Sequence, residues 1–162
     1  MRQLACYLAA AAALLAGGGT ALAAGGGDSP NDRTISAPAD PVIEQAQEKF
    51  RAKDYAGAEA LLGEALRRNP NSADYHNLYA YAIRKGPNPR MALVFEHYNE
   101  ALRLDPKHRG AHEYLGEAYL MVGNLDKAKE HLRILDDLCT FGCPEYTMLK
   151  DAVAAYEAKA KR

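Results

Sequence analysis

Apolar residues recur three and four positions apart along most of the chain beyond residue 40, which is the spacing of amphipathic helices that bury one face. The residues that follow this spacing most clearly are Leu61, Leu62, Leu66, Leu93, Val94, Leu102, Leu125, Leu132 and Leu135. Small residues stand between them where two helices would have to approach closely, as at Ala65, Ala101 and Gly116. The pattern predicts helices near 41–52, 55–68, 73–85, 90–104, 109–122, 125–138 and 144–160.

Proline and turn residues divide these helices into pairs. Pro70 and Pro106 each follow a long helical stretch, and proline cannot continue a helix and also restricts the residue before it. Turn residues stand inside the pairs at 54–55, 87–89 and 123–124. The sequence therefore predicts three helical hairpins and one further helix.

The hairpins also repeat in sequence. Residues 64–70 and 100–106 match at five of seven positions, with an offset of 36. A third copy follows, with Leu115, Gly116 and Ala128 at the corresponding positions. A fixed period of this length indicates stacked units that bury a continuous core.

This pattern resembles the tetratricopeptide repeat (TPR) family. Residues at its signature positions are Ala65, Pro70, Ala101, Pro106, Gly116, Tyr119 and Ala128. The resemblance implies an all-α, right-handed solenoid of three TPR helix-turn-helix repeats, over 41–71, 72–107 and 108–143, followed by a capping helix in 144–162. The stretches 106–116 and 141–146 further resemble a group of small exported bacterial TPR proteins.

Two departures from the family pattern stand out. The distance from Pro70 to Pro106 is 36 rather than 34 residues, and we expect the two extra residues in the turn at 85–89. The first helix has Lys49 where the family usually has tyrosine, so it is either frayed or an N-terminal cap. In the last helix, one stripe is expected to cover the apolar end of the stack; it consists of Tyr146, Leu149, Val153 and Tyr156.

The N-terminus is typical of an export signal. Arg2 precedes an apolar run, glycines break it at 17–19, and Ala21-Leu22-Ala23 suits signal peptidase. We therefore interpret 1–23 as a signal peptide and 24–40, rich in glycine and proline, as a disordered linker. The protein is then exported, to the periplasm by our interpretation. The alternative is that the apolar run is retained as a membrane anchor.

Cleavage after Ala23 would leave Cys139 and Cys143 as the cysteines of the mature chain, in a compartment that permits disulfides. Our hypothesis is a structural disulfide that ties the last repeat to the capping helix, with Gly142 allowing a tight backbone. The alternatives are a thiol redox pair, a metal site or two free thiols. The spacing has three intervening residues rather than two, and two thiolates alone do not complete a zinc site.

Composition and motifs favour a binding protein over an enzyme. The chain has 20 Lys+Arg against 21 Asp+Glu, so nothing in its net charge of −1 favours nucleic acid or an anionic membrane. It has no G-x-S-x-G motif and no phosphate-binding glycine loop after a strand, and we expect no catalytic residues, cofactor or metal.

The histidines are interpreted as structural. His108 is expected at or before a helix start and His112 at a packing position, whereas His97 and His131 are expected to face solvent. A shared metal between His108 and His112 is not favoured.

By the family resemblance, the first helices of the repeats would line a concave groove that holds an extended or helical peptide. The lining here would be Gln47, Arg51, Asn77, Tyr81, Arg84, Glu113, Glu117 and Leu120. Asn77 and Tyr81 could hold a peptide backbone, and Arg84 an acidic group. The sequence thus predicts a monomeric, non-catalytic adaptor whose protein partner docks in the groove or, alternatively, on the convex side or the capping helix.

Overall fold

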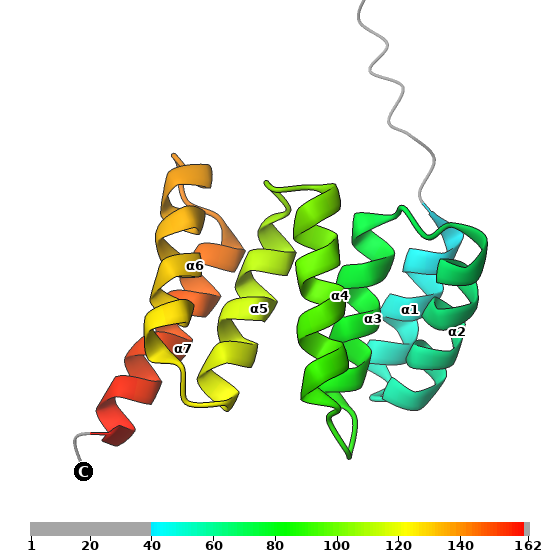
Figure 1. Ribbon diagram of the computed structural model, residues 1–162, viewed down its shortest axis with the longest axis horizontal. Coiled ribbons are helices and arrows are strands. Elements are labelled where there is room, and N and C mark those ends of the chain that lie inside the picture. The colour runs from blue at the N-terminus through cyan, green and yellow to red at the C-terminus, as the bar shows by residue number, and fades with distance from the viewer. Residues whose placement is uncertain (1–39, 161–162) are drawn as a thin grey trace, which may run out of the picture. The chain divides into compact units, whose positions relative to one another are not determined.

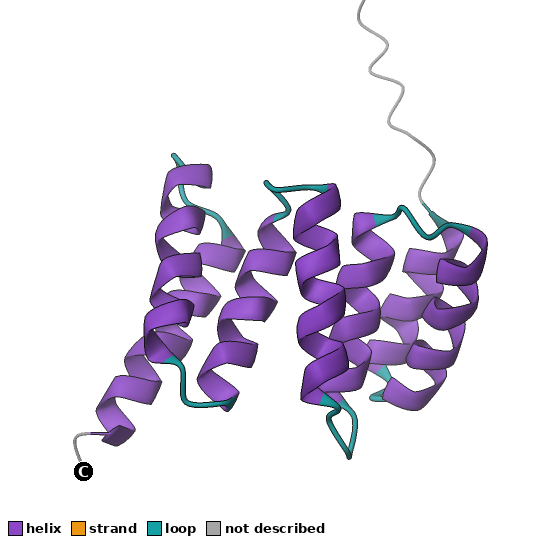
Figure 2. Cartoon of the chain, in the orientation of Figure 1, coloured by secondary structure: helices purple, strands orange, loops and turns teal. Residues whose placement is uncertain are grey.

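The computed structural model describes residues 40–160, and the predicted signal peptide and all but the last residue of the predicted linker lie outside these residues. Within the described range the chain forms α-helices only (Figures 1 and 2). They are α1 (Pro41–Arg51), α2 (Tyr55–Arg68), α3 (Ala73–Lys85), α4 (Met91–Leu104), α5 (Arg109–Met121), α6 (Leu125–Leu138) and α7 (Pro144–Ala160). The helices predicted from the sequence are therefore confirmed, each to within one residue.

Short polar side chains fix where the helices begin. Asp40 accepts from the backbone N–H of Val42 at 2.8 Å and caps α1, and Asp54 accepts from that of Gly57 at 2.8 Å and caps α2. Ser72 and Asn124 cap α3 and α6 in the same way. Such caps satisfy N–H groups that have no partner inside the helix, each typically contributing about 1 kcal/mol.

The turns inside the helix pairs differ in length where the sequence predicted it. Three residues connect α1 to α2 and α5 to α6, whereas five residues, 86–90, connect α3 to α4. The two residues that lengthen the second repeat therefore lie in this turn. In the shorter turns Lys53 and Gly123 occupy equivalent positions with φ of 58° and 80°, a conformation that glycine adopts more easily.

Successive helices pair antiparallel, and the pairs stack side by side (Figure 1). The first helices of the pairs are neighbours, since α1 contacts α3 and α3 contacts α5. Helix α7 packs against both α5 and α6, as expected of a capping helix. Its Leu149 and Val153 are buried, with Tyr146 packed beside them, which confirms most of the predicted stripe.

Two pairs of histidines join the helices of the second and third hairpins. Nδ1 of His76 lies 2.8 Å from Nδ1 of His97, and Nδ1 of His112 lies 2.9 Å from Nδ1 of His131. The prediction that His97 and His131 face solvent is therefore wrong. His131 is buried and His97 is half-buried, because each turns toward the first helix of its own hairpin.

The prolines between the repeats determine the protonation of these pairs. Nε2 of His76 lies 2.8 Å from the carbonyl oxygen of Pro70, and Nε2 of His112 lies 3.0 Å from that of Pro106. A carbonyl only accepts, so Nε2 of His76 and of His112 carries a proton. Within each pair one Nδ1 must donate and the other accept, and the simplest arrangement has His97 and His131 as the donors.

Burial disfavours the charged form of three of these rings. It lowers the pKa of His131 to about 4, with a further contribution from His112, and it also lowers the pKa values of His97 and His112. A proton added to the accepting Nδ1 of His112 would face the Nδ1–H of His131, so this pair requires a neutral His112.

We predict that acid weakens the fold through these pairs. The unfolded chain has ordinary histidines with a pKa near 6.5, so below that pH it binds more protons than the folded chain, and stability falls as pH falls. From His131 alone, the free energy of unfolding should drop by about 2 kcal/mol between pH 8 and pH 5.

The control for this prediction is His131→Gln, whose amide can still donate to His112 but does not titrate. Urea unfolding at pH 5, 6, 7 and 8 should give the variant a shallower pH dependence than the parent chain. The aspartate and glutamate residues make the same contribution to the pH dependence of both proteins, so a difference between the two curves comes from His131. Parallel curves would contradict the prediction.

Candidate functional site

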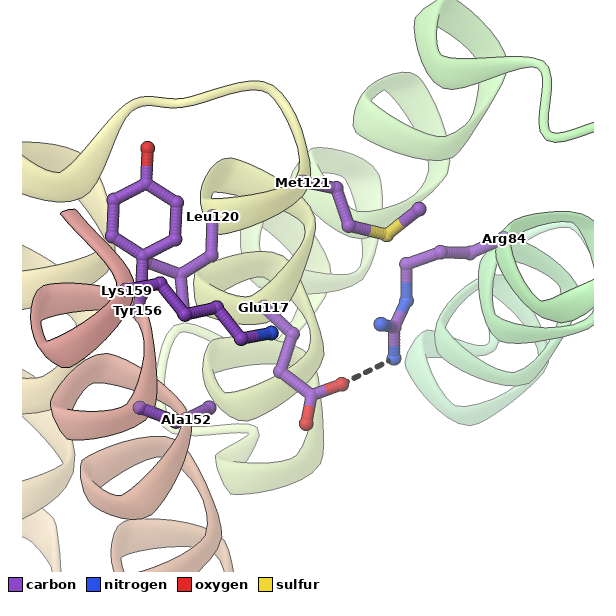
Figure 3. Close-up of a pocket in the computed structure, with 8 residues that line it drawn as sticks. Arg84, Glu117, Leu120, Met121, Ala152, Tyr156 and Lys159 are labelled. Atoms are coloured by element: carbon purple, nitrogen blue, oxygen red, sulfur yellow. Dashed lines mark ion pairs between the residues drawn. The ribbon is translucent and has the colours of Figure 1, made fainter. Parts of the chain in front are cut away.

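The first helices and α7 follow one another across one face of the array, because α1 contacts α3, α3 contacts α5 and α5 contacts α7. We call this surface the first-helix face. A pocket of about 370 Å³ lies on it between α3, α5 and α7 (Figure 3). Its lining consists of Arg84, Glu117, Leu120, Met121, Ala152, Ala155, Tyr156 and Lys159. The pocket is therefore largely apolar, with charged groups at its edges.

Arg84 links three helices beneath this pocket. Its Nη2 lies 2.8 Å from Oε2 of Glu117 on α5, and its Nε donates to the hydroxyl of Tyr98 on α4 at 3.2 Å. The guanidinium carbon lies 5.5 Å from the ring centroids of both Tyr81 and Tyr114, a distance at which cation–π attraction contributes. The side chain of Arg84 is only 4% exposed.

Arg84 keeps its charge in this position. Burial disfavours the charged form, but Tyr98 and Glu117 outweigh it and raise the pKa of the guanidinium above its ordinary value. The sequence suggested that Arg84 could hold an acidic group of a partner. In the structure that role is taken by Glu117 of the same chain, and a partner carboxylate would have to displace it.

Glu113 lies one turn before Glu117 on α5 and has no such partner. Glu113 is 2% exposed, and Oε1 of its carboxyl group accepts no hydrogen bond from any described residue. Burial raises the pKa of this carboxyl to about 7, and the charges of Glu117 and Glu145 add to the effect while Arg84 opposes it. Near neutral pH the carboxyl is therefore divided between its neutral and ionised forms.

The structure brings together part of the predicted groove. Arg84, Glu117 and Leu120 line the pocket. Tyr81 is half-buried, with its ring 4.9 Å from that of Phe50 and 4.7 Å from that of Tyr114.

The other predicted groove residues divide into two groups. Asn77 is buried, as Glu113 is, and its side-chain nitrogen lies close to the backbone of α5 at Gly110. Gln47 and Arg51 are exposed on α1 and do not line the pocket.

More than half of the lining residues are absent from the groove predicted from the sequence. Besides Met121 they are Ala152, Ala155, Tyr156 and Lys159 of α7, a helix predicted to be a cap and, in the alternative, a docking surface of its own. Helix α7 follows α5 as α5 follows α3, so it also contributes to the first-helix face. The spacing of 152, 155, 156 and 159 on one side of the predicted helix was the signal available for these residues.

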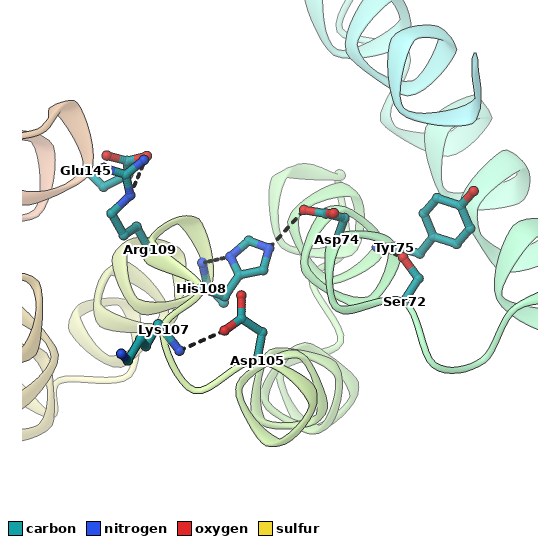
Figure 4. A network of polar contacts seen from close by, with 9 residues as sticks. Ser72, Asp74, Tyr75, Asp105, Lys107, His108, Arg109 and Glu145 are labelled. Atoms are coloured by element: carbon teal, nitrogen blue, oxygen red, sulfur yellow. Dashed lines mark hydrogen bonds and ion pairs between the residues drawn. The ribbon is translucent and has the colours of Figure 1, made fainter. Parts of the chain in front are cut away.

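A polar network borders the first-helix face at the start of α5 (Figure 4). Nδ1 of His108 accepts from the N–H of Ala111 at 3.1 Å, and its Nε2 donates to Oδ1 of Asp74 on α3 at 3.1 Å. The expected position of His108 at the helix start is therefore confirmed. Nε of Arg109 lies 4.0 Å from Oε1 of Glu145, which joins α5 to the first turn of α7.

Cys139 and Cys143 form a disulfide between the end of α6 and the start of α7, with their Cα atoms 5.6 Å apart. Gly142 has φ of 82°, and its N–H donates to the carbonyl of Cys139 at 2.8 Å. Cys143 is buried, so an external thiol has little access to its sulfur. The structure therefore contains the predicted disulfide, and Gly142 adopts the tight backbone conformation that was expected of it.

Two further properties of residues 40–160 bear on function. No group of three or more histidine, cysteine or acidic side chains is arranged there to hold a metal ion. None of the helices in this range is both long enough and apolar enough to cross a bilayer.

Comparison with known proteins identifies relatives by sequence. A family profile described as "Tetratricopeptide repeat" matches residues 43–89 and 96–139, which together make up more than half of the chain. The TPR repeat-containing thioredoxin TTL4 of Arabidopsis thaliana is 30% identical over 102 residues, which cover 62% of this chain and 14% of that protein. The chain thus spans only a small part of that relative.

Solved structures share the fold. The Yersinia enterocolitica type III secretion chaperone SycD, in complex with a peptide of the translocator YopD, has a TM-score of 0.60 and 15% identity over 74% of this chain and 92% of that one. The complex of the yeast Sti1 TPR2B domain with pHsp70 has a TM-score of 0.63 and 19% identity, over 73% and 94%.

We predict that Glu117→Gln destabilises the fold by about 3 kcal/mol, because it leaves the buried guanidinium of Arg84 without a counter-charge. The double variant Arg84→Met with Glu117→Gln should recover much of this loss, because neither charge remains. Urea unfolding of the two single variants and the double variant measures the coupling. Arg103→Met breaks an exposed pair with Glu100 and should change the free energy of unfolding far less than either variant of the buried pair. Additive losses at Arg84 and Glu117 would contradict the assigned ion pair.

We also predict that replacing both cysteines by serine lowers the free energy of unfolding by about 2 kcal/mol, the loop-closure contribution for so short a loop. The helical content measured by circular dichroism should stay unchanged, because the helices pack without the bond. Reduced wild-type protein should show the same loss. Equal melting temperatures for oxidised and reduced protein would show that the bond does not stabilise the fold.

Proposed function

Because this chain belongs to the tetratricopeptide repeat family, we propose that it is a monomeric, non-catalytic adaptor that binds a segment of a partner protein on its first-helix face. The pocket between α3, α5 and α7 carries this proposal. It combines apolar groups of Leu120, Met121 and Ala152 with the charged side chains of Arg84, Glu117 and Lys159, which suits a peptide that presents an apolar side chain.

The solved structures of similar fold support a binding role. SycD is described in complex with a peptide of YopD, and the Sti1 domain in complex with pHsp70. Both are TPR-type arrays holding another protein's segment or domain. We propose that this chain likewise binds a segment of another protein. The identity of that protein is left to experiment.

The compartment is part of the proposal. The apolar run and the Ala21-Leu22-Ala23 site near the N-terminus support export to the periplasm. The disulfide between Cys139 and Cys143 is consistent with an oxidising compartment. We propose that this bond is structural and ties the end of α6 to the start of α7.

Peptide selection tests the binding role. The full-length chain would be used to select from a displayed library of random 16-residue peptides, and affinities of the selected peptides would be measured by fluorescence anisotropy. Ala155→Trp fills the pocket from its rim without touching the buried core, so we expect it to weaken binding at least tenfold.

Ala154→Trp is the matched control, because Ala154 is exposed on the same helix but does not line the pocket. It should bind the selected peptides as the parent chain does. If no peptide is selected, or if both tryptophan variants bind equally well, the first-helix pocket is not the binding site.

A further inference from the structure

Several buried polar atoms on the first-helix face have no hydrogen-bond partner among residues 40–160. They are Asn77 Oδ1, Arg84 Nη2, Glu113 Oε1 and Glu145 Oε2. Arg84 Nη2 differs from the rest, because it lies 2.8 Å from Oε2 of Glu117 in an ion pair that satisfies its charge. The other three are acceptors, and we call them the acceptor cluster. What this face lacks is therefore donors.

The acceptor cluster spans three consecutive first helices. Asn77 is on α3, Glu113 on α5 and Glu145 on α7. A methyl group placed on Gly110 would lie 3.3 Å from Nδ2 of Asn77, and Gly110 and Glu113 are three residues apart on one side of α5. Glu145 is close enough for its charge to act on Glu113. The three side chains thus belong to one neighbourhood.

The charges of this neighbourhood do not balance. Glu117 is paired with Arg84, and Glu145 has Arg109 at 4.0 Å. Glu113 is left without a cation of its own. A buried acceptor without a donor costs about 1–3 kcal/mol, and more when it is charged. A neutral donor would meet the hydrogen-bonding need of Asn77, but only a cation also balances the ionised form of Glu113.

We propose that the acceptor cluster binds the cationic end of a lysine or arginine side chain from the partner segment. The inference rests on the proposed function, since it takes the first-helix face to be the binding surface. Glu113 and Asn77 are only 2% and 4% exposed, so the group that reaches them must be long and slender. Lysine and arginine have that shape, and each carries several N–H donors that can be shared among acceptors on neighbouring helices.

Binding of a cation is coupled to the protonation of Glu113. The groups that act on this carboxyl are Arg84 from α3, Glu117 from its own helix and Glu145 from α7, and the rings of Tyr81 and Tyr114 lie near it. The ordinary pKa of a tyrosine is about 10, and the pKa values of Tyr81 and Tyr114 are raised above it, so neither hydroxyl titrates near neutral pH. Glu113 has a pKa of about 7, and a cation binds its ionised form. Affinity should therefore rise about tenfold from pH 6 to pH 8.

The experiment uses peptides that the full-length chain selects and that contain neither histidine nor cysteine. Each lysine and arginine is replaced in turn by norleucine, which keeps an unbranched aliphatic side chain and removes the cationic group. We expect one such replacement to weaken binding at least tenfold to the parent chain but less than twofold to Glu113→Gln. The pH dependence of the parent affinity should also disappear in Glu113→Gln.

Glu96→Gln is the control variant, because Glu96 is an exposed carboxyl on α4 and its loss changes the net charge by the same amount. It should retain the affinity, the norleucine effect and the pH dependence. Glu113→Gln should melt no lower than the parent chain at pH 8, because it removes an unbalanced buried charge. That melting curve separates a binding effect from a folding effect.

The outcomes distinguish this inference from the function on which it rests. If peptides bind and Ala155→Trp weakens them, but no basic residue matters or Glu113→Gln binds as the parent does, the adaptor role stands and the cation site is wrong. If the selected peptides are acidic, the cation site is likewise wrong. If no peptide binds, the proposed function fails and the cation site fails with it.

Discussion

Close approach between helices is the constraint on which this structure depends. In α1 through α6, residues with a methyl side chain or none stand where neighbouring helices meet. They include Ala46, Ala58, Ala80, Ala101, Gly116 and Ala128, which are buried. At Gly116 a methyl group would already lie 2.6 Å from the side chain of Leu149, so α7 reaches α5 only because no side chain is present there. The short separation brings the larger side chains of both helices into one core, which provides most of the burial free energy.

The same constraint creates the first-helix face. When helices stack in pairs, α3, α5 and α7 become neighbours, and side chains from all three line one pocket. Polar groups on that face are then drawn partly out of water. Arg84 shows the result: its guanidinium is held by a carboxylate on α5, a hydroxyl on α4 and two aromatic rings.

The sequence predicted features that depend on neighbouring residues in the chain better than contacts between residues that are far apart in it. Helix ends, the longer turn at 86–90 and the glycine between the cysteines all depend on neighbours in sequence, and each could be predicted from one or two residue types. The positions of His97 and His131 could not. Each lies next to a packing position, but its partner stands 21 or 19 residues earlier, and only the tertiary arrangement shows that the two rings meet.

The candidate site follows the same rule. Arg84 and Glu117 could be assigned to one face from helical periodicity, but the burial of Arg84 depends on Tyr98, which belongs to the next helix. Helix α7 lines the pocket because it continues the row of first helices. That position depends on the packing of Leu149 and Val153 in the core, which the sequence alone does not show.

In α3 and in α5, a histidine with both ring nitrogens hydrogen-bonded is followed directly by a buried polar residue that lacks a partner for one acceptor. His76 and His112 have both ring nitrogens bonded, one to a histidine and one to a proline carbonyl. The next residue in each helix, Asn77 or Glu113, is just as buried but leaves an acceptor without a partner. The chain can therefore satisfy buried polar groups completely, and it does so twice at positions that serve only the packing of a hairpin. Unsatisfied acceptors one residue away, at the same place in both repeats and on the open face, are better explained by a donor that arrives with a partner than by imperfect packing.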